Sequence, residues 1–251
     1  MSGHSKWKTI KHQKGAADAK RGQLFTKLTR ELMMAARVGG ADPAMNARLR
    51  LAVERARDAN MPMENIDRAI KRATGEADQS QLEELVYEGY GPGGIAVLAF
   101  VLTDNRNRAV SEIRNIMDRN GGKLGQTGSV SWNFEQKGVL TLEVDPGKAE
   151  EVALASIDLG AEDFSVDSAS VELRCEASKL ESLKVALEKQ GIKAASSEVT
   201  MVPKTTVSLE EKTAEQALRL LDRLEELDDV QRVASNADFA EGVLERLSKA
   251  A

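Results

Sequence analysis

The residues best suited to bind phosphate are concentrated at the N-terminus of this 251-residue chain. The first thirty residues contain eight Lys/Arg and one acidic residue, together with both histidines of the chain. Trp7, one of two tryptophans, stands between Lys6 and Lys8. Lysine and arginine release condensed counterions when they contact phosphates, and an exposed tryptophan can stack on a base. This composition predicts an N-terminal arm that binds nucleic acid.

The predicted contacts continue beyond the arm into outward-facing positions of the segments that follow. The alternative interpretation is a solvated basic terminus without a partner. We favour binding, because charge and tryptophan coincide in the arm while the remainder of the chain is acidic. The predicted nucleic-acid-binding residues are Lys6, Trp7, Lys8, Lys11, His12, Lys14, Lys20, Arg21, Lys27, Arg48, Arg55, Arg106 and Arg108.

Charge is divided by position along the chain. The whole sequence has 35 Lys/Arg and 40 Asp/Glu, a net charge of −5. Residues 1–75 have 16 Lys/Arg and 7 Asp/Glu, a net of +9, whereas the remainder has 19 and 33, a net of −14. Such asymmetry indicates that one end meets nucleic acid while the rest repels it. An equally physical interpretation is that the acidic remainder faces a basic protein surface.

A second polar segment, Asp104-Asn-Arg-Asn-Arg108, follows the most apolar predicted strand. Strand ends of this kind are where α/β sheets usually present ligand sites, and a helix N-terminus favours anions. Arg106 and Arg108 could therefore reach a phosphate or a carboxylate. The alternative is a helix cap, in which Asp104 or Asn105 accepts from the first amides and the arginines are solvated. The residues alone leave both interpretations open.

Two glycine-rich segments invite comparison with phosphate-binding loops. Gly89-Tyr-Gly-Pro-Gly-Gly94 matches G-x-G-x-x-G, but a dinucleotide site needs a helix N-terminus after the glycines, and here a strand is predicted. We therefore interpret this segment as a connection between strands. The segment 121–128 contains four glycines, so it could approach a partner's backbone closely or simply reverse the chain.

Catalytic chemistry has little support in the sequence. The two histidines lie eight residues apart in the arm, and the 251 residues contain no Walker loop, triad pattern or zinc-binding cluster. Cys175 lies in an alternating run and is interpreted as a strand position rather than a nucleophile. Acidic runs such as Glu225-Glu-Leu-Asp-Asp229 are interpreted as solvated surface. We expect a non-enzymatic protein without cofactor or metal, and keep a carboxylate-dependent nuclease as the enzyme alternative.

Composition describes a soluble globular protein, with 41% hydrophobic and 30% charged residues. No signal peptide and no run of membrane-spanning length is visible in the sequence. The single cysteine suits a reducing compartment. A cytoplasmic location without a membrane partner is therefore the expectation, and the oligomeric state stays open.

Periodicity divides the first third of the chain. A basic arm, 1–21, has no sustained period. Apolar residues at helical spacing then predict three helices in a basic helical domain, 22–78. Asp42-Pro43 is expected to begin the second helix, with aspartate as the N-cap, and Met61-Pro62 the third.

Strand patterns follow a polar linker at 76–81. They predict a buried central strand at 95–102, a helix at 106–120 and a strand at 129–134. Residues 137–202 then follow the order β-α-β-β-α-β, which is the ferredoxin-like split unit.

The βαβ pattern after residue 203 is too small to stand alone, so we predict that it completes the sheet begun earlier. This gives an inserted ferredoxin-like domain, 136–203, within a discontinuous α/β middle domain, 79–135 plus 204–251. The predicted fold class is α+β with three domains: an N-terminal three-helix domain and two α/β domains, one of them ferredoxin-like.

Five motifs, in order along the chain, resemble one protein family. They are Gly3-His-Ser-Lys-Trp7, Ala19-Lys-Arg-Gly22, Tyr87-Glu-Gly-Tyr-Gly-Pro-Gly-Gly94, Asp104-Asn-Arg-Asn-Arg108 and Gly125-Gln-Thr-Gly-Ser-Val130. Together they are similar to the YebC/PmpR family, whose mitochondrial relative is the translational activator of cytochrome oxidase subunit I. The similarity spans essentially the full length. It implies three domains, an N-terminal helical one and two α/β ones.

The resemblance implies regulation of gene expression by one of two routes. Family members are widely described as transcriptional regulators that bind DNA, and they have also been tied to translation at proline-rich stretches and on a mitochondrial message. Our hypothesis is a cytoplasmic nucleic-acid-binding regulator, with DNA as its first target. The alternative is a ribosome-associated translation factor that binds ribosomal RNA. The acidic remainder disfavours wrapping along a duplex and suits insertion of one basic end into structured RNA.

Overall fold

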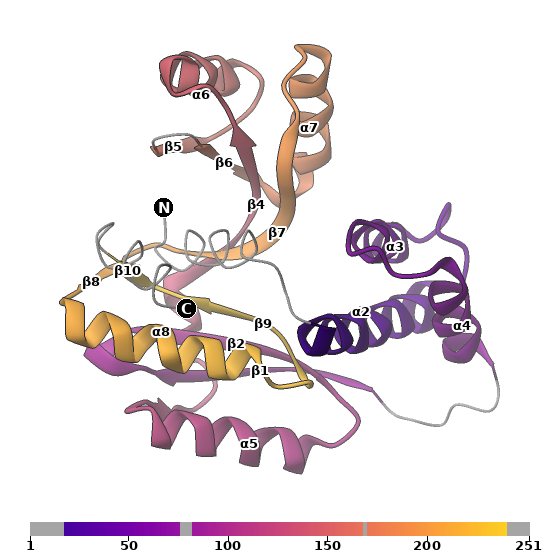
Figure 1. The fold of residues 1–251 in the computed structure, drawn as a ribbon, viewed down its shortest axis with the longest axis vertical. Helices are drawn as coiled ribbons and strands as arrows, with labels where there is room; N and C mark the ends of the chain where they lie inside the picture. The colour runs from indigo at the N-terminus through magenta and orange to yellow at the C-terminus, as the bar shows by residue number, and fades with distance from the viewer. Residues whose placement is uncertain (1–17, 76–81, 168–169, 240–251) are drawn as a thin grey trace.

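The computed structural model describes residues 18–75, 82–167 and 170–239. A helical unit, residues 18–75, precedes two units that each contain a four-stranded sheet (Figure 1). The α+β fold class predicted from the sequence is confirmed.

The helical unit consists of three helices that share one core. They are α2 (Asp18–Gly39), α3 (Ala47–Asp58) and α4 (Met63–Thr74). Apolar residues at three- and four-residue spacing form one stripe on each helix, and α2 packs against both of the others. Leu32, Leu49 and Ile66 are fully buried where the stripes meet. The three predicted helices are therefore present, although the first begins four residues before residue 22.

The predicted start of α3 is wrong. Asp42-Pro43 forms a turn, and the N-cap is Asn46, whose Oδ1 accepts a hydrogen bond from the Leu49 amide at 3.0 Å. The same side chain donates to the carbonyls of Ala35 and Gly40, at 2.8 Å each. Asn46 is buried, and its amide can cap α3 and still donate two hydrogen bonds to the end of α2, whereas an aspartate carboxylate could donate none. Tertiary contacts thus override the local signal of the aspartate.

The first sheet is antiparallel, with the strand order β3-β1-β2-β9. Its strands are β1 (Glu83–Tyr90), β2 (Ala96–Thr103), β3 (Lys123–Leu124) and β9 (Val230–Ser235). The helices α5 (Arg106–Arg119) and α8 (Glu211–Glu225) cover one of its faces. Central strand β2 is apolar up to Leu102, because Val97, Ala99 and Val101 face these helices, while Ala96 and Leu98 pack on the other side. The predicted buried central strand is confirmed.

Short elements complete this unit. Pro92–Gly94 forms one turn of 3₁₀ helix between β1 and β2, so the G-x-G-x-x-G segment joins two strands as predicted. The parallel pair β8 (Val207–Leu209) and β10 (Ala237–Phe239) lies beside α8 and adds to the same core.

The strand predicted at 129–134 is wrong. Ser131–Asn133 forms a turn of 3₁₀ helix, and β4 begins only at Phe134. The physical reason is that the amides of Val130 and Ser131 donate to the Glu88 carboxylate instead of to a neighbouring strand.

The second sheet is also antiparallel, with the order β5-β6-β4-β7. Its strands are β4 (Phe134–Glu143), β5 (Asp163–Asp167), β6 (Ser170–Glu176) and β7 (Ala194–Pro203). Its helices are α6 (Ala149–Asp158) and α7 (Leu180–Lys189), each preceded by a 3₁₀ turn, Pro146–Lys148 and Ala177–Lys179. This is the β-α-β-β-α-β order and strand arrangement of the ferredoxin-like unit, as predicted.

The β4–β7 ribbon rises from the open face of the first sheet (Figure 1). Phe134 and Met201, at its base, pack with Leu98. Arg232 of β9 places its guanidinium 4.2 Å from the ring centre of Phe100 and donates to the Val199 carbonyl at 2.7 Å. Strands that precede β4 in the sequence and a strand that follows β7 both belong to the first sheet. The domain boundaries given above stay a prediction.

None of the helices within the described ranges is long and apolar enough to cross a membrane.

Candidate nucleic-acid interface

Six of the predicted contacts can be placed through their side chains. The arm residues Lys6, Trp7, Lys8, Lys11, His12 and Lys14 lie outside the described residues, and Lys20 is placed only by the backbone of α2. Arg21 is exposed on α2, and Arg106 is exposed at the start of α5. The other four, Lys27, Arg48, Arg55 and Arg108, all contact groups of the protein itself.

Arg108 belongs to a charge network around one buried carboxylate, although its own side chain is 40% exposed. Its guanidinium contacts Asp229 through Nε at 3.1 Å and Nη2 at 2.9 Å, and Asp104 through Nη2 at 2.6 Å. Arg30 of α2 approaches Oδ1 of Asp229 at 2.8 Å, and the Thr103 hydroxyl donates to Oδ2, the oxygen that Arg108 also contacts, at 2.9 Å. The Asp229 side chain is only 4% exposed. Asp229 therefore joins the helical unit, β2 and α5 in one contact.

The short contacts at this junction shift the pKa values of Asp104 and Arg108. The hydrogen bond from Arg108 lowers the pKa of Asp104 below its ordinary value. Hydrogen bonds to Asp104 and then Asp229 raise the pKa of Arg108. Both groups stay charged across the physiological range. The interpretation of residues 225–229 as solvated surface is wrong for Asp229, because two arginines from distant segments neutralise it.

In the Asp104–Arg108 segment, one residue caps a helix, as the helix-cap interpretation requires, and another presents a cation, as the ligand-site interpretation requires. Asn105 is the N-cap of α5, since its Oδ1 accepts from the Arg108 amide at 3.0 Å. Arg108 is paired with the carboxylates of Asp104 and Asp229. Arg106 makes no ion pair or side-chain hydrogen bond with the described residues, so it alone of the segment's two arginines presents an uncommitted cation.

Lys27 holds the helical unit against the end of α8. Its ammonium donates to the Glu225 carbonyl, and Arg30 donates to the Asp228 carbonyl. Gln23 reaches the Glu226 carbonyl at 3.4 Å. Terminal carbonyls carry the negative end of the helix dipole, so cations are favoured there. This placement gives Lys27 a structural partner.

Arg48 and Arg55 lie seven residues apart, on one face of α3. Arg48 pairs with Glu84 at the start of β1, and Arg55 pairs with Glu31 of α2 at 2.9 Å. Their side chains are nearly half exposed. Exposed ion pairs contribute little, about 0–1 kcal/mol, so a phosphate could replace the carboxylate at small cost.

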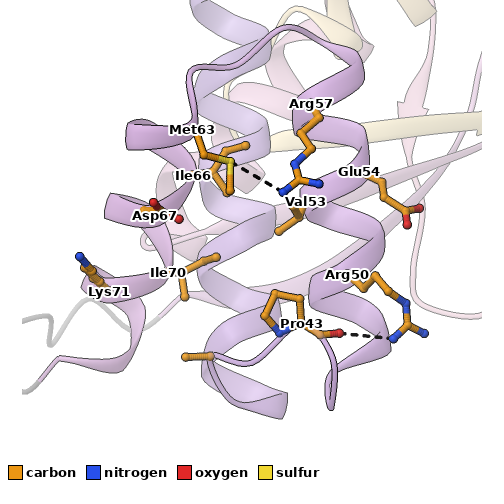
Figure 2. A pocket seen from close by; sticks show the side chains of 11 residues that line it. Pro43, Arg50, Val53, Glu54, Arg57, Met63, Ile66, Asp67, Ile70 and Lys71 are labelled. Carbon is orange, nitrogen blue, oxygen red and sulfur yellow. Dashed lines mark hydrogen bonds between the residues drawn. The ribbon is translucent and has the colours of Figure 1, made fainter.

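A groove of about 520 Å³ lies between α3 and α4 (Figure 2). Val53, Ile66 and Ile70 form its apolar floor. Three cations, Arg50, Arg57 and Lys71, and two carboxylates, Glu54 and Asp67, line it. The sequence could have indicated the two arginines, because Arg50 and Arg57 are seven residues apart and so share one face of α3. The predicted contacts omitted all three cations.

A second buried carboxylate organises the glycine-rich loop. Glu88 accepts hydrogen bonds from the amides of Gly128 and Val130 at 2.7 Å and of Ser131 at 2.8 Å. Burial alone would raise the pKa of Glu88, but these amides outweigh it and lower the pKa below 4.5. The loop's backbone is thus anchored to β1 by one side chain.

Two exposed aromatic rings contact this anchored loop: Tyr90 at the end of β1 and Trp132 in the 3₁₀ turn Ser131–Asn133. Tyr90 Oη and Trp132 Nε1 both donate to the Ser129 carbonyl, at 2.9 and 3.0 Å. Trp132 is 68% exposed and Tyr90 is 45% exposed. The sequence-based predictions missed Trp132, because its segment resembled a strand.

The remaining titratable groups give no further site within the described ranges. No group of three or more His, Cys, Asp or Glu that could hold a metal occurs among those residues. Cys175 is a free, buried thiol, and burial raises its pKa, as its interpretation as a strand position implies.

Comparison with known proteins identifies the family. Residues 5–76 match the family model described as "TACO1/YebC protein N-terminal domain". Residues 82–237 match the model described as "TACO1/YebC second and third domain". The chain belongs to the TACO1/YebC family. The family resemblance drawn from the five motifs is therefore confirmed.

Relatives in the family share the full length of the chain. A protein of Dehalococcoides mccartyi is 54% identical over 246 residues, 98% of both chains, and one of Treponema denticola is 51% identical over 242 residues, 96% and 98% of the two chains. Both are named as probable transcriptional regulatory proteins. The crystal structure of a conserved hypothetical protein from Aquifex aeolicus is similar at a TM-score of 0.80 and 44% identity, covering 89% of this chain and 93% of that one.

Proposed function

We propose that this protein is a non-enzymatic regulator of gene expression that binds nucleic acid through its basic N-terminal third, with DNA as its first target. The observation that supports this most is the division of charge, +9 on residues 1–75 against −14 on the remainder. A basic region on an acidic protein concentrates attraction for phosphates at one end. The names of the relatives point to the same kind of role.

The helical unit supports the proposal independently of the arm. Residues 18–75 have 12 Lys/Arg and 7 Asp/Glu. Among the residues that the structure describes, Arg48 and Arg55 pair with Glu84 and Glu31 in exposed ion pairs, and the α3–α4 groove adds Arg50, Arg57 and Lys71. Phosphate contacts position a protein on nucleic acid without reading its sequence. We assign this positioning role to the helical unit and arm together.

The place of action is proposed to be the cytoplasm. The single cysteine is a free thiol, which suits a reducing compartment.

The test is removal of residues 1–17, which leaves α2 intact because that helix begins at Asp18. The deletion removes four lysines and no acidic residue. Each lost phosphate contact lowers the slope of log K against log salt by about 0.9 on duplex DNA. We expect weaker binding, a shallower slope and an unchanged unfolding midpoint. Replacing Lys6, Lys8, Lys11 and Lys14 with Gln in the full chain is the matched control for charge alone. An unchanged slope in both variants would contradict the role of the arm.

A ribosome-associated role is the second candidate, and the acidic remainder favours it. Residues 76–251 repel a duplex but could face basic ribosomal proteins while the basic end enters structured RNA. Crosslinking in cells separates the two candidates. Recovery of defined operator DNA supports transcriptional control, whereas recovery of ribosomal RNA alone would exclude it.

A further inference from the structure

The loop that carries Trp132 is built to hold two aromatic rings still while leaving them uncovered. Glu88 is buried at 5% exposure, and its partners include three backbone amides of this loop. Burying a carboxylate costs free energy unless hydrogen bonds compensate it. The buried Glu88 carboxylate therefore fixes the backbone of residues 128–131, directly before Trp132. Nothing in the packing of the core requires Trp132, because two-thirds of its surface is exposed.

The polar edges of both rings are already occupied. Trp132 Nε1 and Tyr90 Oη donate to the same carbonyl, that of Ser129, so the two ring edges converge on one point. What the rings still offer is their faces. A peptide ligand presents backbone carbonyls that need donors, and both donors are used here. A nucleobase needs only a π-face, and stacking on aromatic side chains is how unpaired bases are commonly bound.

Charge around the rings suits the same ligand. Lys123 is the Cα partner of Tyr90 across the β1–β3 pair, so the two side chains project from the same face of the sheet as close neighbours. Lys123 is exposed. An ammonium beside an open ring can meet the phosphate of a stacked nucleotide. The rest of this unit is acidic on balance, which makes the placement of a lysine here more telling.

We propose that Trp132 and Tyr90, with Lys123, form a stacking site for an unpaired base of a nucleic acid. The site is separate from the basic helical unit. Arg48 contacts Glu84 at one end of β1, and Tyr90 lies six residues further along, roughly 20 Å away at 3.3 Å per residue. A strand held by the helical unit could therefore reach the rings. The inference rests on the proposed nucleic-acid binding and adds a second contact point to it.

The test uses the full chain with Trp7→Phe, in which Trp132 is the only tryptophan. Its emission is followed during titration with 12-nucleotide oligo(U), oligo(dT) and a DNA duplex of the same length, while the anisotropy of labelled oligonucleotide reports total binding. We expect the single strands to quench the emission in step with binding and the duplex to quench it less. A difference between oligo(U) and oligo(dT) shows whether the unpaired base comes from RNA or DNA.

Substitutions then separate stacking from charge. Trp132→Ala is expected to weaken single-strand binding about tenfold without changing the salt slope, because stacking is not electrostatic. Trp132→Phe keeps a ring face but not the indole N–H and should retain most of the affinity. Lys123→Gln should lower the slope by about 0.7. Leu154→Ala, at a leucine of α6 that is 62% exposed, is the matched control and should bind normally.

Each outcome has one meaning. Unchanged emission and a normal Trp132→Ala affinity, with anisotropy still reporting binding, would overturn the stacking site and leave the proposed function standing. Absence of any binding by the chain that retains Trp7, measured by the same anisotropy, would overturn both. Quenching by a proline-rich peptide and not by oligonucleotides would reassign the rings to protein recognition.

Discussion

Asp229 and Glu88 are both buried carboxylates, yet the protein neutralises them in different ways. Asp229 is held by guanidinium groups from α2 and α5, which are far apart in the sequence. Glu88 is held by backbone amides of a single loop. Cationic side chains can reach across units, whereas amides bind only where the backbone itself approaches. The first arrangement therefore joins units, and the second shapes one loop.

Asp229→Ala should have the largest effect on stability. It leaves Arg30 and Arg108 without their shared partner and the Thr103 hydroxyl without its acceptor. Breaking a buried pair costs about 3–5 kcal/mol, and we expect about 3 because both arginines can gain solvent. Denaturant unfolding measures the loss. Asp228→Ala, at the exposed neighbour, should change the free energy of unfolding by less than about 0.5 kcal/mol. Equal effects of the two substitutions would show that Asp229 is not a junction.

Glu88→Gln should cost less and act locally. The amide keeps one acceptor oxygen but loses the charge, and hydrogen bonds to charged groups contribute about 1.5–3 kcal/mol. We expect a loss of about 2 kcal/mol, together with faster hydrogen exchange at the amides of residues 128–131. Glu84→Gln, on the same face of β1 but exposed, is the matched control. Uniform acceleration of exchange across the molecule would contradict a loop-specific role.

Elements with strong periodicity were predictable from the sequence, and long-range polar contacts were not. The apolar stripe of α4 and the alternation in the ferredoxin-like unit have a local cause, so one segment is enough to read them. Asn46 caps α3 because it also reaches α2, and Asp229 is buried because Arg30 arrives from two hundred residues away. Neither partner is visible in the local pattern. The strand expected at 129–134 failed for the same reason, since Glu88 takes its amides.

The pH dependence of stability should distinguish the two carboxylates further. The folded pKa of Glu88 is below its ordinary value of 4.5. Its contribution is therefore complete above pH 4.5 and is lost as the pH falls toward the folded pKa. Subtracting the unfolding curves of Glu88→Gln from those of the parent protein between pH 3 and 7 should give a constant difference at neutral pH that shrinks below about pH 4.5. A difference that grows on acidification would mean that the sign of the shift is wrong.

Exposed ion pairs should contribute less to stability than the two buried carboxylates, but one of them should matter for DNA binding. Arg55→Ala removes the pair with Glu31, which should change the free energy of unfolding by about 0.5 kcal/mol or less. If the arginine meets phosphate instead, the same substitution lowers the salt slope of DNA binding by about 0.9. Arg223→Ala is the matched control, because Arg223 makes a similar exposed pair with Glu226 at 3.0 Å on α8. It should have the same small effect on stability and none on the slope. Equal slopes for both variants would remove Arg55 from the interface and confine binding to the other cations of the basic end.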